Sequence, residues 1–150
     1  KNIQYIFWGT LFFRLIIFSS LALILDFIFM IYKIANNEVN QFIFYVLGIE
    51  FIIAGMILIY GMILRLDKTT NKVLNASLIR FGIELSLIYF ILLDYGIVAA
   101  AIILLIARYI ETLVTFIYIR NQRFFKYSEM LLLCFSIIIV YLFYKMQVIF

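Results

Sequence analysis

The sequence predicts an all-α integral membrane protein, a bundle of about five transmembrane helices. Of its 150 residues, 68% are hydrophobic and only 13% are charged, whereas a typical soluble domain has about 25% charged residues. The mean hydropathy is +1.19, and the apolar residues form long stretches separated by short polar joints. Each stretch reaches the roughly 20 residues that a helix needs to cross a bilayer. Open strands would leave backbone groups unpaired in lipid, and no stretch alternates as a barrel strand does.

The first two predicted helices cover residues 3–34 and 42–64. The first is longer than a membrane requires, so we expect it to tilt or to begin with an interfacial turn. Tyr5 and Trp8 suit that turn, because aromatic side chains of this kind favour the headgroup level. The second helix ends at residues 65–72 (RLDKTTNK), the most polar joint of the chain.

The last three predicted helices cover residues 73–93, 97–119 and 128–148. A tight turn at residues 94–96 (DYG) joins the first two of them, so they should pack antiparallel. A basic joint at 120–126 (RNQRFFK) precedes the last helix. We treat residues 1–150 as a single transmembrane helical domain, because no linker or soluble segment interrupts the pattern.

The basic residues of the joints predict the orientation. If five helices alternate across the bilayer, the two basic joints lie on the same side, and the positive-inside rule places them in the cytoplasm together with the N-terminus. Their basic residues are Arg65, Lys68, Lys72, Arg120, Arg123 and Lys126. The C-terminus then lies outside. We expect a bacterial or archaeal inner membrane, or alternatively a mitochondrial inner membrane.

The composition excludes several kinds of chemistry. The chain has no His and a single cysteine, Cys134, which rules out an intramolecular disulfide, a cysteine–zinc site and a nucleophile–His pair. We therefore expect no enzymatic activity, no catalytic residue, no metal and no cofactor. The net charge of +4 lies in the joints, which indicates topology or lipid headgroups rather than nucleic acid. Because the first residue is Lys1, we expect a processed or incomplete chain, and no signal-peptide cleavage site is visible.

Seven ionisable residues fall inside the predicted spans. Each costs roughly 2.5–3.5 kcal/mol on insertion scales if it stays charged at the bilayer centre. They are Arg14, Asp26, Glu50, Arg80, Glu84, Arg108 and Glu111. Arg80 and Glu84 are four residues apart, and Arg108 and Glu111 are three apart, so each couple shares a helical face and can pair.

The two arginine–glutamate couples should lie at nearly the same depth. Arg80 and Arg108 are about equally far from the turn at 94–96, at 1.5 Å of rise per residue. Both couples could therefore face one interior, polar cavity. Two interpretations remain open: structural ion pairs that hold helices together, or a cationic lining that receives an anionic substrate group. Where a span boundary differs, a charge would instead snorkel to the interface.

The remaining candidate residues lie outside the two arginine–glutamate couples. Arg14 and Asp26 lie about 18 Å apart along one helix, so each needs a partner elsewhere, and Arg14 could also snorkel. Glu50 is interpreted as the partner of an arginine on another helix in preference to a proton-coupling group. Gly96 and Ala100 form a small-xxx-small step, which favours close helix packing.

Part of the chain carries an ordered series of features. A basic, polar joint (MILRLDKTTNK, 62–72) is followed by a polar-started span (LNASLIRFGIELSLIYFIL, 74–92), then a tight turn rich in small residues (YGIVAAAI, 95–102) and a basic joint (120–126). Over residues 48–124 this series resembles the multidrug/oligosaccharidyl-lipid/polysaccharide flippase superfamily. That superfamily includes polysaccharide flippases, lipid II flippases and multidrug extruders.

The resemblance implies a larger machine. Members of the superfamily have two pseudo-symmetric lobes that rock about a central cavity, so five spans would form part of one lobe. By this analogy Arg80 and Arg108 would face the cavity that holds a lipid-linked phosphate. Arginine suits that role because its guanidinium makes bidentate hydrogen bonds to phosphate oxygens.

Three functional hypotheses follow. The first and favoured one is flippase-like translocation of a lipid-linked anionic oligosaccharide or polysaccharide precursor, as part of a larger chain or assembly. The second is a small subunit of a respiratory or ATP-synthase complex, in which buried acids and arginines move protons. Residues 48–61 (GIEFIIAGMILIYG) resemble a short stretch of one membrane subunit of respiratory complex I. The third is a structural membrane module without a transport path. The expected partners are the lipid bilayer, other transmembrane helices or subunits and, for the first hypothesis, a lipid-linked phosphate.

Overall fold

The computed structural model describes residues 2–35, 37–119, 131–132, 134–138 and 141. Within these ranges the regular structure is entirely helical, which confirms the predicted all-α class. The helices are α1 (Asn2–Leu23), α2 (Leu25–Ile31), α3 (Glu38–Leu66) and α4 (Thr70–Ile119). Four stretches have the length and apolar composition to cross a membrane: Gln4–Leu23, Glu38–Leu66, Thr70–Ile91 and Tyr95–Ile119. The chain is thus an integral membrane protein by length and composition.

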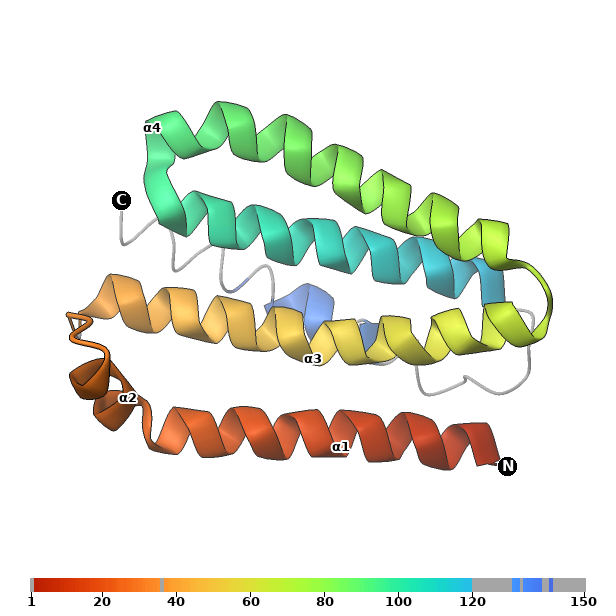
Figure 1. The fold of residues 1–150 in the computed structure, drawn as a ribbon, viewed down its shortest axis with the longest axis horizontal. Helices are drawn as coiled ribbons and strands as arrows, with labels where there is room; N and C mark the ends of the chain where they lie inside the picture. Colours follow the sequence, from red (N-terminus) through yellow and green to blue (C-terminus); the bar gives the residue numbers. More distant parts are fainter. Residues whose placement is uncertain (1, 36, 120–130, 133, 139–140, 142–150) are drawn as a thin grey trace.

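Helix α4 folds back on itself and forms two antiparallel arms (Figure 1). We call Thr70–Ile91 the outer arm and Tyr95–Ile119 the inner arm. Half of the most apolar stretch of the inner arm is buried, compared with 6% for the outer arm. Helix α3 lies between α1 and α4, so α3 and the inner arm form the centre of the bundle, while α1 and the outer arm flank it.

The reversal between the two arms occurs at Gly96. Its backbone has φ 68° and ψ −162°, a region that only glycine adopts at low cost. The predicted tight turn is therefore present at the predicted place. A Cβ added to Gly96 would meet no heavy atom within 4 Å. Gly96 consequently serves the backbone conformation of the turn rather than close helix packing, while Ala100, one turn further on, is half-buried in the inner arm.

The predicted single helix over residues 3–34 is two helices. Helix α1 ends at Leu23, and Ile24 takes a non-helical conformation before α2 begins. The apolar pattern continues through this break, and for that reason the sequence alone suggested one long span. Asp26 lies in the first turn of α2, where a carboxylate is favoured by the helix dipole. It is exposed and lies beyond the spanning part of α1.

Helix α3 is longer than the predicted 42–64 because polar residues cap both ends. The side chain of Asn37 accepts a hydrogen bond from the backbone N–H of Asn40 at 2.8 Å, which is an N-cap. Glu38 lies in the first turn and Arg65 in the last, each favourable for the helix dipole. The hydroxyl of Thr69 donates to the carbonyl of Leu64 at 3.0 Å and closes the C-terminal end.

The apolar core lies between α3 and the inner arm. Ile53, Met56 and Tyr60 of α3 are fully buried, and Leu105 of the inner arm packs in the same cluster. The ring of Tyr60 stacks on that of Phe7 from α1, with centroids 6.0 Å apart. This packing holds α3 as the central helix against which the other elements are placed.

Most of the predicted fifth helix, 128–148, and the whole basic joint, 120–126, lie outside the described residues. The described parts of that helix are helical: 131–132, 134–138 and 141. Leu132 belongs to the core cluster, and the hydroxyl of Tyr109 donates to its carbonyl oxygen at 3.2 Å. This segment therefore packs against the inner arm of α4.

Candidate functional site: an intramembrane ion-pair network

Charged side chains from α3 and from both arms of α4 meet near the middle of these helices. Glu50 comes from α3, Arg80 and Glu84 come from the outer arm, and Arg108 and Glu111 come from the inner arm. We call these five residues the ion-pair network. Charges buried at this depth are costly unless they are paired, so their gathering is the most informative feature of the structure.

Arg108 links α3 to the inner arm. Its Nε lies 2.5 Å from Oε1 of Glu50, and its Nη1 donates to Oε2 of Glu111 at 2.9 Å. Charge-assisted hydrogen bonds of this kind are roughly twice as strong as neutral ones. Glu50 therefore has an arginine of another helix as its partner, which is the interpretation that the sequence favoured.

Glu111 joins the two arms. It accepts a hydrogen bond from the Ser77 hydroxyl at 2.8 Å, and the Nη1 of Arg80 lies 3.7 Å from its Oε2. The side chain of Glu111 is only 3% exposed, so both arginines and Ser77 converge on a carboxylate that is removed from solvent. Glu111 is the centre of the network.

Arg80 and Glu84 form the outer end of the network. The Nε of Arg80 donates to Oε1 of Glu84 at 2.5 Å, one turn along the same helix. The side chain of Arg80 is 27% exposed. A groove of about 310 Å³ opens beside the pair, and its lining residues are Leu74, Ser77, Leu78, Arg80, Phe81 and Glu84. The network is thus buried at Glu111 and accessible from the groove at Arg80.

The structure brings together the four residues predicted to share one depth, Arg80, Glu84, Arg108 and Glu111, and adds Glu50 to them. Sequence reasoning missed Ser77. It lies three residues before Arg80, on the same helical face, so the spacing that paired Arg80 with Glu84 could have found it.

Arg14 lies beside the network on α1. Its guanidinium donates to the backbone carbonyl of Phe51 and lies 4.4 Å from the centroid of the Phe51 ring. Arg14 is half-buried, and its guanidinium contacts α3. Asp26 lies apart from this group, in α2.

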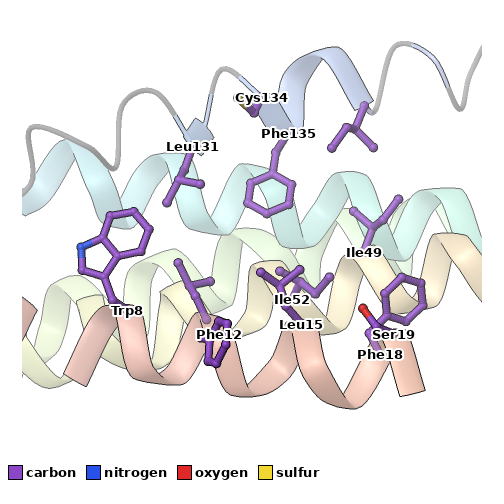
Figure 2. Close-up of a pocket in the computed structure, with 12 residues that line it drawn as sticks. Trp8, Phe12, Leu15, Phe18, Ser19, Ile49, Ile52, Leu131, Cys134 and Phe135 are labelled. Atoms are coloured by element: carbon purple, nitrogen blue, oxygen red, sulfur yellow. The ribbon is translucent and has the colours of Figure 1, made fainter. Parts of the chain in front are cut away.

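A second, larger groove of about 600 Å³ is lined by residues of α1, of α3 and of the segment that contains Leu131 and Phe135 (Figure 2). Trp8, Phe12 and Leu15 of α1 face Ile52 of α3 and Phe135 across it. Apart from Ser19 and Cys134, the side chains that line it are apolar, and none is charged. Of these two grooves, the one beside Arg80 is therefore the one whose lining can recognise an ion.

The charged groups of the network are carboxylates and guanidiniums. Among the described residues, no group of three or more His, Cys, Asp or Glu is placed to hold a metal ion. A guanidinium has five N–H donors, and Arg80 has a groove beside it. Arg80 can therefore replace one hydrogen-bonded oxygen with an oxygen from another group. Comparisons with family models, curated proteins and solved structures found no match to this chain.

Proposed function

We propose that this chain is part of a flippase-like membrane transporter that moves a lipid-linked anionic substrate, and that Arg80 receives the anionic group. The observation that carries the proposal is an arginine in the middle of a membrane-spanning arm, partly exposed and beside a groove. A charge at this depth almost always faces the bundle interior, a water-filled cavity or a ligand. The sequence resemblance to the flippase superfamily supports the same conclusion.

The hydrogen bonds of Arg80 leave donors for a substrate. Its Nε is used by Glu84, while its Nη1 lies 3.7 Å from Glu111, beyond ordinary hydrogen-bond distance. A guanidinium can donate two parallel hydrogen bonds to two phosphate oxygens, and the single ammonium group of lysine cannot reproduce this geometry. A phosphate that enters the groove would compete with Glu111 and Glu84 for Arg80.

The direction of the network gives less support to a proton-conducting subunit. Its ion pairs run sideways, from α3 through the inner arm to the outer arm. A proton path would have to run along the helices, from one side of the bilayer to the other. The second candidate is instead a structural membrane module, and the complete pairing of Glu50, Arg108 and Glu111 favours it.

Lipid translocation in liposomes distinguishes these two candidates. The protein is purified in the assembly that it forms in its native membrane and reconstituted with a fluorescent polyprenyl phosphate, and dithionite measures how much of the label reaches the outer leaflet. We expect Arg80→Gln to slow translocation about tenfold or more, because it removes charge-assisted hydrogen bonds of about 1.5–3 kcal/mol. The translocation rate of Arg80→Lys should lie between those of the wild type and Arg80→Gln, because lysine keeps the positive charge but cannot form two parallel hydrogen bonds to a phosphate.

The matched control is Arg65→Gln, at the exposed C-terminal end of α3. It removes the same charge from the chain outside the groove, and its rate should equal that of the wild type. If the wild-type protein moves the labelled phosphate no faster than protein-free liposomes, the flippase proposal is wrong and the structural module stands. Equal rates for wild type and Arg80→Gln would remove Arg80 from the path.

A further inference from the structure

The larger, apolar groove runs lengthwise between two walls. One wall is α1, the other is the C-terminal segment (131–132 and 134–138), and α3 contributes Ile52 between them (Figure 2). Along α1 the groove extends from Trp8 to Ser19, which is about 16 Å at 1.5 Å of rise per residue. The hydrocarbon core of a bilayer is about 30 Å thick. The groove is therefore about as long as one leaflet is deep.

Helix α1, the first wall, is held close to α3 over two glycines. The ring of Phe18, which lines the groove, lies over Gly48, and a Cβ at that position would overlap with it. A Cβ at Gly55 would lie 2.7 Å from the Cδ of Arg14. Gly48 and Gly55 are two helical turns apart on one face of α3. These contacts fix the first wall in place.

The C-terminal segment, the second wall, is held by the inner arm of α4. The hydroxyl of Tyr109 is hydrogen-bonded to the hydroxyl of Ser136 and also donates to the carbonyl oxygen of Leu132. Leu132 and Phe135 belong to the apolar core cluster. Each wall thus has its own attachment to the centre of the bundle, and the groove between them stays open.

The chemistry of the lining favours a hydrocarbon chain as the occupant. No lining side chain is charged, so a water molecule would lack the two to four polar partners that it needs. Leaving the space empty would deprive the lining of dispersion contacts. A methylene group is of the size of a water molecule, which occupies about 30 Å³ of liquid, so the groove of about 600 Å³ has room for roughly 20 of them. That is enough for one long acyl chain and too little for two.

The Trp8 end of the groove lies near the basic joint of the bundle. The N-terminus of α1 and the joint between α3 and α4 are at the same end (Figure 1). Phe7, which precedes Trp8, stacks on Tyr60 of α3, so Trp8 lies at about the level of Tyr60. Arg65 lies about 7.5 Å beyond Tyr60 along α3, at 1.5 Å per residue. A chain that begins at Trp8 therefore has its headgroup at the level of the joint.

The charges of the two ends of the bundle select the headgroup. Residues 65–72, at the Trp8 end, contain three basic side chains and one acidic one, whereas residues 26–38, at the opposite end, contain one basic and two acidic ones. Arg65 and Lys68 are exposed. Basic side chains at the membrane surface attract anionic lipids. The Trp8 end therefore complements a negatively charged headgroup, and the opposite end does not.

We propose that the apolar groove binds one acyl chain of an anionic phospholipid, whose headgroup lies at the basic end of the bundle. The chain enters at Trp8, whose side-chain type favours the headgroup boundary, and runs towards Ser19. It fills the space between α1 and the C-terminal segment and so joins the two walls. The inference goes beyond the proposed function and does not require a lipid-linked substrate.

Photo-crosslinking tests the inference. The protein, in the assembly that it forms in its native membrane, is reconstituted in phosphatidylcholine vesicles with a trace of phosphatidylglycerol that carries a diazirine in one acyl chain. After illumination, mass spectrometry measures the label on Ile52 and Phe135, which line the groove but are buried from the surface of the bundle. We expect several-fold more label from this probe than from phosphatidylcholine with the same diazirine chain. Excess unlabelled phosphatidylglycerol should remove the difference.

Leu15→Trp and Ile16→Trp form a matched pair of variants. The two side chains are neighbours on α1 and are 46% and 47% exposed, but only Leu15 lines the groove. The larger ring at position 15 should obstruct the groove and lower the label on Ile52 several-fold, whereas Ile16→Trp should keep the wild-type level. If Leu15→Trp loses its fold, the comparison of the two probes on the wild type decides the case.

Three results would overturn the inference. They are equal labelling by the two probes, wild-type labelling in a folded Leu15→Trp variant, and displacement of the probe by a polyprenyl phosphate at a lower concentration than by phosphatidylglycerol. The last result would assign the groove to the chain of a lipid-linked substrate instead. None of these readouts measures transport, so the failure of the proposed function and the failure of this inference are distinguishable.

Discussion

Replacing Glu111 with leucine is expected to destabilise the bundle by about 3–5 kcal/mol, because it leaves two arginines without their shared carboxylate. Arg108 and Arg80 both lie against Glu111, and the Ser77 hydroxyl donates to it as well. Glu111 is nearly inaccessible, so water cannot replace the lost acceptor. Leucine has a similar volume, and the effect is therefore electrostatic rather than a cavity. Unfolding in mixed detergent micelles, followed by loss of helical circular dichroism, measures it.

Glu84→Leu is the control for this prediction. Glu84 also accepts a hydrogen bond from an arginine, but among the described residues its ion pair is with Arg80 alone, and it lies at the open end of the network. Glu84→Leu should therefore lower the free energy of unfolding clearly less than Glu111→Leu. If Glu84→Leu and Glu111→Leu had the same stability, Glu111 would not be the centre of the network.

Replacing Gly96 with valine is expected to cost about 1–3 kcal/mol and to weaken the packing of the outer arm. The backbone at Gly96 is in a region that a residue with a Cβ adopts only under strain, and a β-branched residue suffers most. The space around Gly96 is open, so the cost arises from the backbone alone. The same unfolding measurement applies, together with the translocation rate, because the outer arm carries Arg80.

Gly82→Ala tests the reasoning about Gly96 on the same helix. A Cβ at Gly82 would also meet nothing within 4 Å, but Gly82 has an ordinary helical backbone. Alanine there should leave stability unchanged or raise it by about 0.5–1 kcal/mol. A destabilisation equal to that of Gly96→Val would show that neither effect comes from the turn.

Local rules were sufficient to predict the four membrane-spanning stretches found among the described residues, and the first ion pair. Hydropathy and length predicted the helices, and the position of Gly96 between two apolar stretches predicted the turn. The spacing of Arg80 and Glu84 predicted their pairing, because residues four apart share a helical face. Each of these depends on residues that are near one another in the chain.

The rest of the site depends on how the helices are placed against each other. Nothing local to Arg80 indicates that Glu111 lies opposite it, since that contact requires the rotation of both arms about their axes. The position of Arg14 likewise depends on how α1 is aligned along α3, which is determined by the contacts over Gly48 and Gly55. The end of α1 at Leu23 was also missed, because the hydropathy does not change there.

The most direct test of the transport account asks whether water reaches the groove beside Arg80. In a protein that carries Cys134→Ser, the variants Leu78→Cys and Ile79→Cys are compared, because the two positions are neighbours in sequence and nearly equal in depth. Both positions are exposed in the bundle, but only Leu78 lines the groove. A charged, membrane-impermeant thiosulfonate reagent requires a thiolate, which forms only where water is present. We expect the Leu78→Cys variant to react and the Ile79→Cys variant to remain unmodified. An unreactive Leu78→Cys variant would mean a dry groove and would contradict a substrate path along the outer arm.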